Sequence, residues 1–274
     1  MMSRKLHIGT NLKMYKTIRE TVSYLTELER LVADVANELV LFVIPSYTAL
    51  SGASAAVDQN RIRLGAQNMH WEEKGQFTGE ISPLMLRELN LRIVEIGHSE
   101  RRHVFGETDL EENKKVISAI RHGFTALLCV GETAEEKELN IGDERIRQQL
   151  KIGLRGQDSS GCSQLWIAYE PVWAIGVDGI PATADYAEQK HRLIRETLVQ
   201  LFPHGGGRVP ILYGGSVNAQ NADEFIAQPA VDGLFIGRSA WEATAFDRLI
   251  RQVLPVWQQK IQKGARGYED RIDG

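Results

Sequence analysis

The stretch Ala168-Tyr169-Glu170-Pro171-Val172-Trp173-Ala174-Ile175-Gly176 joins a short apolar run to a loop shaped by proline and glycine. The run begins at Leu165 and is apolar on both faces, which is typical of a parallel strand covered on both sides by helices. A carboxylate, Glu170, directly follows the run. Because desolvation disfavours the charged form, burial there should raise the pKa of Glu170 and make it a stronger base. The stretch therefore predicts a buried strand with a candidate base at its carboxyl end.

Similar apolar runs recur along the whole chain, separated by segments whose apolar residues have helical spacing. Examples of that spacing are Val22, Leu25 and Leu28 in the first segment, and Ile194 and Leu198 in the sixth. Eight alternating strands and helices in about 250 residues are what closure into a (β/α)8 barrel requires. The expected strands are Leu6–Asn11, Leu39–Ile44, Ile62–Gln67, Leu91–Ile96, Thr125–Val130, Leu165–Tyr169, Val209–Tyr213 and Gly233–Ile236.

The chain is expected to form one domain. The rival architecture is a six-stranded open sheet with a second domain, but no linker rich in Pro, Gly or Ser divides the chain into halves. The run Gly205-Gly206-Gly207 is better explained as a turn from helix to strand. We therefore expect an α/β protein with a single barrel domain over residues 1–263 and a polar, partly disordered tail over residues 264–274.

The composition is that of an ordinary globular protein, with 43% hydrophobic and 25% charged residues among 274. A net charge of -4 argues against a nucleic-acid partner, which requires a clustered basic excess. The two cysteines, Cys129 and Cys162, favour neither a disulfide framework nor a zinc site, so a reducing cytoplasm is expected. No run is suited to a signal peptide or a membrane span, so a soluble protein without a membrane partner is expected.

Polar motifs follow expected strands one, four, six and seven, at the end where barrels of this type place their sites. Asn11 and Lys13 are two residues apart, so in extended backbone both side chains point to the same side. Lys13 would then offer a positive charge to an anion or a developing oxyanion. The alternative is a capping asparagine and a solvated lysine.

His98 follows Gly97 directly after the fourth expected strand, and a neutral imidazole there can donate to a substrate oxygen. Ser99 and Glu100 can cap and charge the start of the next turn. The alternatives are a structural histidine with satisfied hydrogen bonds and, for Glu170, a glutamate in a salt bridge. The joint pattern favours a catalytic interpretation.

Two glycine-containing turns follow the last two expected strands. Gly214-Gly215-Ser216 is expected to precede a helix that begins near Asn218, where free backbone N–H groups would stabilise a phosphate. Gly237-Arg238-Ser239 follows strand eight. Phosphate sites of such barrels frequently use these two loops, so the turns predict a phosphate cradle.

From about Leu6 to Trp257 the chain resembles the triosephosphate isomerase family, whose fold is the TIM barrel. By resemblance Glu170 is the catalytic base, His98 the neutral electrophile and Lys13 the electrostatic clamp. Glu100 is then a carboxylate that supports these catalytic side chains without contacting the substrate. The motifs recur in the family's order and spacing as Gly-Thr-Asn-Leu-Lys-Met (9–14), Ala-Gln-Asn (66–68), Phe-Thr-Gly-Glu-Ile-Ser (77–82), Ile-Gly-His-Ser-Glu-Arg-Arg (96–102), Cys-Val-Gly-Glu (129–132), Ala-Tyr-Glu-Pro-Val-Trp-Ala-Ile-Gly (168–176) and Leu-Tyr-Gly-Gly-Ser-Val (212–217). The expected substrate-binding residues are Asn11, Gly176, Ser216, Gly237 and Arg238.

The resemblance implies interconversion of a ketose phosphate and an aldose phosphate. Glu170 would remove a proton from the carbon beside the carbonyl, and His98 and Lys13 would stabilise the resulting enediolate. Neither a metal nor a redox cofactor is expected. A lid from Pro171 to about Thr183 would close over the phosphate through N–H groups near Gly176 and exclude water.

The chain departs from the family's pattern at three places. Thr10, Leu12 and Tyr15 stand where Gly, Trp and Asn are usual, which touches the packing around Lys13. The second lid hinge lacks the usual Thr-Gly-Lys form and is one residue longer. Arg238 stands where a second glycine is usual, so either the backbone cradle is altered or the guanidinium has joined it. The alternative for Arg238 is a solvent-facing loop residue.

These departures leave the base, imidazole and clamp in place and change the pocket around them. They favour L-erythrulose 1-phosphate as substrate, converted to D-erythrose 4-phosphate. The alternative is the ordinary triose reaction of dihydroxyacetone phosphate to D-glyceraldehyde 3-phosphate, and one added hydroxymethyl group needs few rearranged side chains. A non-catalytic binding barrel is disfavoured because Glu170 and His98 are present.

The loop 68–79 carries two large apolar groups, Trp71 and Phe77, in a polar connection, which suggests a docking element. By family resemblance this loop enters a twin subunit near Asn11 and Lys13, with Thr78 at the contact. We therefore expect a homodimer. The alternative is that both aromatic rings pack under their own loop.

Overall fold

The computed structural model describes residues 5–176 and 179–269. Within those ranges the parallel strands close into a barrel in sequence order, and β1 pairs with both β2 and β8. The predicted barrel is therefore confirmed. The strands are β1 (Leu6–Asn11), β2 (Leu39–Ile44), β3 (Ile62–Ala66), β4 (Ile93–Ile96), β5 (Thr125–Val130), β6 (Leu165–Tyr169), β7 (Ile211–Tyr213) and β8 (Gly233–Ile236).

Three strands are shorter than their apolar runs suggested. β3 ends at Ala66, β4 begins at Ile93 and β7 begins at Ile211. Pro210 precedes β7 and has no N–H to donate, although its carbonyl accepts the N–H of Ile167 at 2.9 Å. The apolar runs thus located every strand but included flanking residues that lie outside the ladders.

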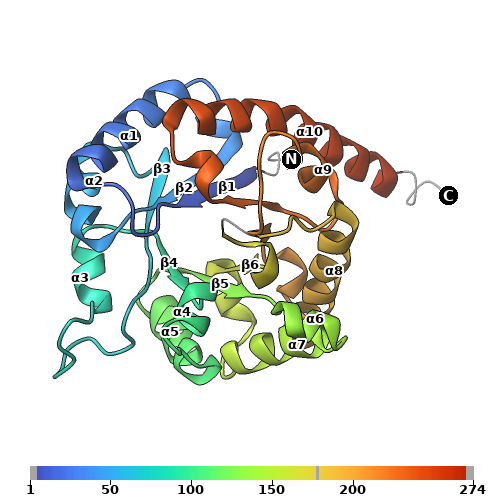
Figure 1. Cartoon of the computed structure of the whole chain (residues 1–274), viewed down its shortest axis with the longest axis horizontal. Coiled ribbons are helices and arrows are strands. Elements are labelled where there is room, and N and C mark those ends of the chain that lie inside the picture. Colours follow the sequence, from blue (N-terminus) through green and yellow to red (C-terminus); the bar gives the residue numbers. More distant parts are fainter. Residues whose placement is uncertain (1–4, 177–178, 270–274) are drawn as a thin grey trace.

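Helices form an outer ring around the strands (Figure 1). Their first turns show why they begin where they do: α1 follows a capping box made by Thr17 and Glu20, and α5 follows one made by Thr108 and Glu111. The helices are α1 (Ile18–Leu31), α2 (Leu50–Ala56), α3 (Pro83–Glu88), α4 (Ser99–His103), α5 (Asp109–Arg121), α6 (Ala134–Glu138), α7 (Gly142–Gly153), α8 (Ala184–Leu201), α9 (Ala222–Ala227) and α10 (Ala243–Glu269).

Two apolar layers fill the fold, and β2 shows how one strand serves both. Leu39, Leu41 and Val43 belong to the large cluster between strands and helices. The residues that alternate with them, Val40, Phe42 and Ile44, face the other way and belong to a second cluster. That second cluster occupies the barrel interior, where the rings of Phe42 and Trp166 lie 5.5 Å apart. Because the interior is filled by side chains, a functional cavity has to lie at the mouth of the barrel.

The C-terminal helix α10 continues to Glu269, beyond the start of the expected tail at residue 264. The last residues, 270–274, lie outside the described residues, and the division at residue 264 stays a prediction. None of the described helices combines the length and the apolar composition needed to cross a membrane.

The loop after β3 fits the docking expectation only in part. Trp71 is half-buried against its own chain, where the Nζ of Lys114 lies 4.7 Å from its ring and Ser118 donates to its carbonyl. The ring of His70 stacks on Trp71 at 4.2 Å. Phe77, by contrast, is 44% exposed. Phe77, not Trp71, is therefore the apolar group that this loop presents to the outside.

Candidate active site

A cavity of about 950 Å³ opens at the carboxyl ends of the strands. It brings together all the predicted catalytic and substrate-binding residues, although they come from five different strand ends and their loops. The lining includes Asn11, Lys13, His98, Glu100, Glu170, Gly176, Ser216, Gly237 and Arg238.

Lys13 reaches the cavity by a different route from the one expected. The strand ends at Asn11, and Lys13 has a left-handed backbone with φ of 50° instead of extended backbone. The Oδ1 of Asn11 accepts the N–H of Lys13 at 2.6 Å and so closes a tight turn. The expectation that Asn11 and Lys13 lie in one extended strand was therefore wrong, although both side chains do line the cavity.

His98 is placed by the short helix α4, which it caps. Its Nδ1 accepts the N–H of Glu100 at 3.2 Å, so in a neutral ring the proton lies on Nε2. The preceding Gly97 has φ of +72°, and a Cβ there would lie 2.8 Å from the guanidinium of Arg102. The turn that aims His98 into the cavity therefore requires glycine at position 97.

Glu170 is 3% exposed and lies just past the end of β6. Its Oε2 accepts the N–H of Ser99 at 3.0 Å, and its Oε1 lies 3.5 Å from Nε2 of His98. A Cβ on Gly131 would stand 1.8 Å from the carbonyl oxygen of Glu170, so only glycine permits this close approach of the two loops. The backbone that carries the candidate base is thus closely packed against Gly131, which directly follows β5.

Glu100 and Lys13 form an ion pair at the cavity edge, with 2.6 Å between Nζ and Oε1. Burial by itself raises the pKa of Glu100, but the hydrogen bond from Lys13, the proximity of His98 and the charge of Lys13 outweigh it, and the pKa is lowered overall. Glu100 therefore remains a carboxylate and holds the ammonium group beside His98.

The end of the cavity formed by the loops after β7 and β8, where a phosphate is expected, lacks the helix start that the sequence suggested. Helix α9 begins at Ala222, not near Asn218. The intervening residues form a polar turn in which Asn221 accepts the N–H of Asn218 at 2.8 Å and donates to the carbonyl of Ser216 at 3.0 Å. These asparagine side chains satisfy the backbone without a helix, so the helix-start argument does not apply to this loop.

Arg238 spans the end of the cavity where a phosphate is expected. Its side chain is exposed, but it lines the cavity and its Nη2 donates to the carbonyl of Gly176 at 3.0 Å. The guanidinium thereby connects the loop after β8 with the loop after β6. Two residues of the expected lid, Val177 and Asp178, lie outside the described residues, and lid closure stays a prediction.

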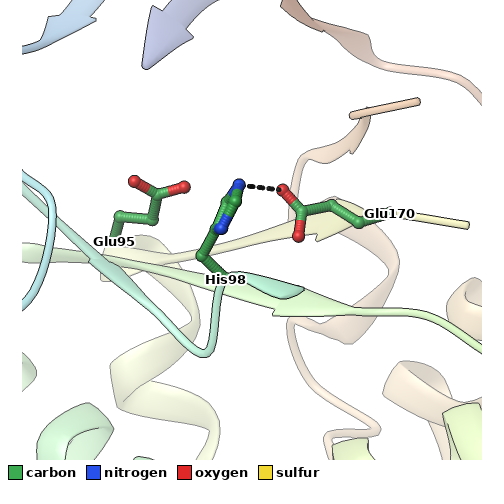
Figure 2. Close-up of side chains that lie close together, drawn as sticks. All are labelled: Glu95, His98 and Glu170. Atoms are coloured by element: carbon green, nitrogen blue, oxygen red, sulfur yellow. Dashed lines mark ion pairs between the residues drawn. The ribbon is translucent and has the colours of Figure 1, made fainter. Parts of the chain in front are cut away.

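Glu95 is a carboxyl that the sequence analysis overlooked. It is 0% exposed on β4, and its Oε2 accepts the Nδ2–H of Asn11 at 2.7 Å. Figure 2 shows its carboxyl group on one side of the His98 ring and that of Glu170 on the other. The signal in the sequence was a lone charge in the run Ile93 to Ile96, at an inward position that it shares with Ile93.

Glu95, His98 and Glu170 are also the side chains here that could hold a cation, since each offers one ligand atom within 4.8 Å of the others. Metal binding requires a deprotonated carboxylate. Burial, and then the charge of Glu170, raise the pKa of Glu95 well above its ordinary value. The chemistry of this set therefore favours a proton on Glu95 over a metal ion.

Comparison with known proteins agrees with the barrel fold. The sequence profile described as Triosephosphate isomerase matches residues 6–253. An L-erythrulose-1-phosphate isomerase from Rhizobium etli is 47% identical, over 90% of this chain and 91% of that protein. A protein of the same name from Rhizobium meliloti is 45% identical, over 90% of this chain and 96% of its own length. The crystal structure of triosephosphate isomerase from Bartonella henselae superposes with a TM-score of 0.81 at 33% identity, covering 90% of this chain and 98% of that one. The chain belongs to the triosephosphate isomerase family.

Proposed function

We propose that this protein is an isomerase that moves the carbonyl of a short-chain sugar phosphate to the neighbouring carbon through an enediolate, and that its substrate is L-erythrulose 1-phosphate. The observation that carries the proposal is the convergence of a buried carboxylate and an imidazole N–H, with 3.5 Å between Oε1 of Glu170 and Nε2 of His98. The ammonium group of Lys13 lines the same cavity. A base, a donor and a positive charge are the groups that a carbon-to-carbon proton transfer beside a carbonyl requires.

In the proposed mechanism Glu170 removes a proton from the carbon next to the carbonyl. The Nε2–H of His98 donates to the oxygen on which negative charge develops, and Lys13 stabilises the same charge. The former carbonyl oxygen takes a proton from Nε2 of His98, and the former hydroxyl oxygen gives its proton back to that nitrogen. Glu170 then returns the carbon-bound proton to the former carbonyl carbon, so that the carbonyl moves by one position. The hydrogen bond from Glu100 N–H to Nδ1 supports this role, because it keeps the proton of a neutral imidazole on the nitrogen that faces Glu170.

We propose that the phosphate of the substrate lies between the loops after β6, β7 and β8. Gly176, Ser216, Gly237 and Arg238 all line that end of the cavity. A guanidinium can bind a phosphate with two parallel hydrogen bonds, which would let Arg238 contribute where paired glycines are usual.

The names of the similar rhizobial proteins favour the tetrulose over the triose, and the altered residues at the phosphate end agree with a changed pocket. One proton transfer in L-erythrulose 1-phosphate moves the carbonyl from C2 to C3 and gives a tetrulose 4-phosphate. D-Erythrose 4-phosphate, the expected end product, carries its carbonyl one carbon further on, so it lies two such transfers away. The same single transfer in dihydroxyacetone phosphate gives D-glyceraldehyde 3-phosphate directly.

The proposal is tested by initial rates of the purified protein with L-erythrulose 1-phosphate and dihydroxyacetone phosphate, compared as kcat/KM. Carbon-13 spectra of the product distinguish a ketone at C3 from an aldehyde at C4. We expect a higher kcat/KM for the tetrulose. A preference for the triose would make the ordinary triose isomerisation the function, and turnover of neither would overturn the isomerase proposal.

We further propose a homodimer in which Phe77 and Thr78 of the loop 68–79 enter a twin subunit beside Lys13. The exposed Phe77 supports this, as do the exposed Met14 and Tyr15 beside Lys13, which are 94% and 59% exposed. We place the protein in the cytoplasm because both cysteines, Cys129 and Cys162, are free thiols.

A further inference from the structure

The interior of the barrel contains a carboxyl group that the proposed reaction does not use. Along β4, Val94 and Ile96 pack outward among the helices, while Ile93 packs inward with the apolar interior cluster. Glu95 therefore shares the inward face with Ile93, and it is 0% exposed. A buried carboxyl destabilises a fold unless its hydrogen bonds compensate, so its contacts indicate what it does.

The main contact of Glu95 is with the side-chain amide of Asn11. Oε2 of Glu95 accepts the Nδ2–H of Asn11 at 2.7 Å. The other end of the amide, Oδ1, accepts the backbone N–H of Lys13 at 2.6 Å and the Nε2–H of Gln67 at 3.0 Å. Gln67 also donates to the carbonyl of Lys13 at 2.8 Å. Glu95 thus binds the N–H end of the amide, whose oxygen holds the N–H of Lys13, while Gln67 holds the carbonyl of Lys13.

The Lys13 turn needs such support because its backbone is in the left-handed region, with φ of 50°. Non-glycine residues hold this conformation when surrounding hydrogen bonds enforce it. A rotated Asn11 amide would present N–H groups to the N–H of Lys13 and would remove the bond that closes the turn. The ammonium group would then lose its fixed position beside His98.

We propose that Glu95 is a positioning residue for the isomerisation: its buried carboxyl fixes the Asn11 amide, and through it the backbone that aims Lys13 into the cavity. This inference rests on the proposed function, since Lys13 acts there on the developing negative charge. Glu95 itself is not among the residues that line the cavity.

The protonation state of Glu95 determines which substitution can replace it. The titratable and charged groups that surround it are Lys13 beyond β1, His98 at the cap of α4, Glu100 on α4, Cys129 on β5, and Glu170 beyond β6. Burial and the charge of Glu170 raise its pKa well above the ordinary value, so its surroundings favour the uncharged form. An uncharged carboxyl offers Asn11 a carbonyl oxygen, and glutamine offers the same group. Leucine has a similar size and offers none.

The test compares Glu95→Gln with Glu95→Leu, using kcat and KM for L-erythrulose 1-phosphate. We expect Glu95→Gln to stay within about threefold of wild type and Glu95→Leu to lose kcat by ~10²-fold with little change in KM, the scale for a misplaced catalytic group. The melting temperature of Glu95→Leu should be at or above that of wild type, because an apolar side chain replaces a buried carboxyl. Wild-type kcat in Glu95→Leu would overturn the proposal. Equal losses in both variants would also overturn it, because they would assign proton transfer to the carboxyl itself.

Crystal structures of the two variants keep this inference separate from the proposed function. If the wild-type protein converts neither sugar phosphate, the isomerase proposal fails, and the structures alone decide the role of Glu95. A rotated Asn11 amide or an altered Lys13 turn in Glu95→Leu, but not in Glu95→Gln, supports positioning. An unchanged turn in both variants overturns it.

Discussion

The Nε2 atom of His98 lies 3.5 Å from Oε1 of Glu170, and both side chains are buried at the mouth of the barrel. The two residues follow different strands, β4 and β6. Each accepts a hydrogen bond from a backbone N–H: His98 from that of Glu100, and Glu170 from that of Ser99. A donor and a base with fixed positions can act on one carbonyl and its neighbouring carbon without rearranging first.

Replacing the candidate base should abolish most turnover without unfolding the protein. Glu170→Gln keeps an oxygen that can accept the N–H of Ser99 but cannot accept a proton from carbon. We expect kcat to fall by at least ~10²-fold, the low end for a positioned acid–base group. Initial rates measure the effect, and near-ultraviolet circular dichroism verifies the packing. Wild-type turnover would exclude Glu170 as the base.

The imidazole can be tested apart from the cap that it provides. Asparagine is a good N-cap, so His98→Asn should preserve the start of α4 while removing the N–H that faces Glu170. We expect kcat to fall ~10²-fold with an unchanged melting temperature. A melting temperature that falls together with kcat would point instead to loss of the cap.

The guanidinium of Arg238 should matter for binding more than for chemistry. We expect Arg238→Ala to raise KM about tenfold, which is about 1.4 kcal/mol, with a smaller effect on kcat. Arg238→Lys keeps the charge without the planar pair of donors, so its KM should lie between those of wild type and Arg238→Ala. An unchanged KM in both variants would make Arg238 the solvent-facing loop residue of the alternative interpretation.

His191 should make the protein less stable in acid. It is 0% exposed on α8, and burial lowers its pKa to about 3. In the unfolded chain a histidine titrates near its ordinary pKa of about 6.5. Between these two values the unfolded state binds a proton that the folded state does not, so stability rises with pH and is lost as pH falls, by up to ~1.4 kcal/mol per pH unit.

The variant His191→Gln cannot titrate, so the advantage of wild type over it should shrink as pH falls below about 6.5. Urea unfolding of both proteins at several pH values measures the difference, and all other titrating groups cancel in the comparison. A difference that is constant with pH would show that His191 does not titrate across the unfolding transition.

The proposed dimer depends on an exposed aromatic ring. We expect Phe77→Glu to yield a monomer in light scattering at micromolar concentration, because a carboxylate cannot be buried in an apolar contact without a partner. Leu139→Glu is the matched control, since Leu139 is 62% exposed on another part of the surface. A wild-type protein that is monomeric under the same conditions would contradict the proposal.

Much of the architecture could be read from the sequence because parallel strands are apolar on both faces. The runs ending at Asn11, Val130 and Tyr169 coincide with the observed strands for this reason. The convergence of His98, Glu170 and Lys13 was also predictable, because in such a barrel residues that follow different strands meet at one mouth.

Local backbone geometry was not predictable in the same way. Lys13 is left-handed because Asn11 accepts its N–H, a hydrogen bond that strand periodicity does not encode. The turn at Asn218 replaces an expected helix start because Asn221 bonds to its backbone. Glu95 went unnoticed because an apolar run hides a single charge, and only the closed barrel reveals that its neighbour is Asn11. These features depend on side-chain contacts between segments far apart in sequence.

Closure of the barrel joins the beginning of the chain to its end. β1 pairs with β8, and the indole Nε1 of Trp241 donates to the carbonyl of Asn11 at 3.0 Å. On the ribosome Asn11 emerges first and Trp241 near the end, so the mouth stays incomplete through most of translation. Contacts of such long sequence separation form late and slowly. A nascent or truncated chain that stops before β8 would therefore expose the unpaired edge of β1 and lack a complete site, and exposed strand edges promote aggregation.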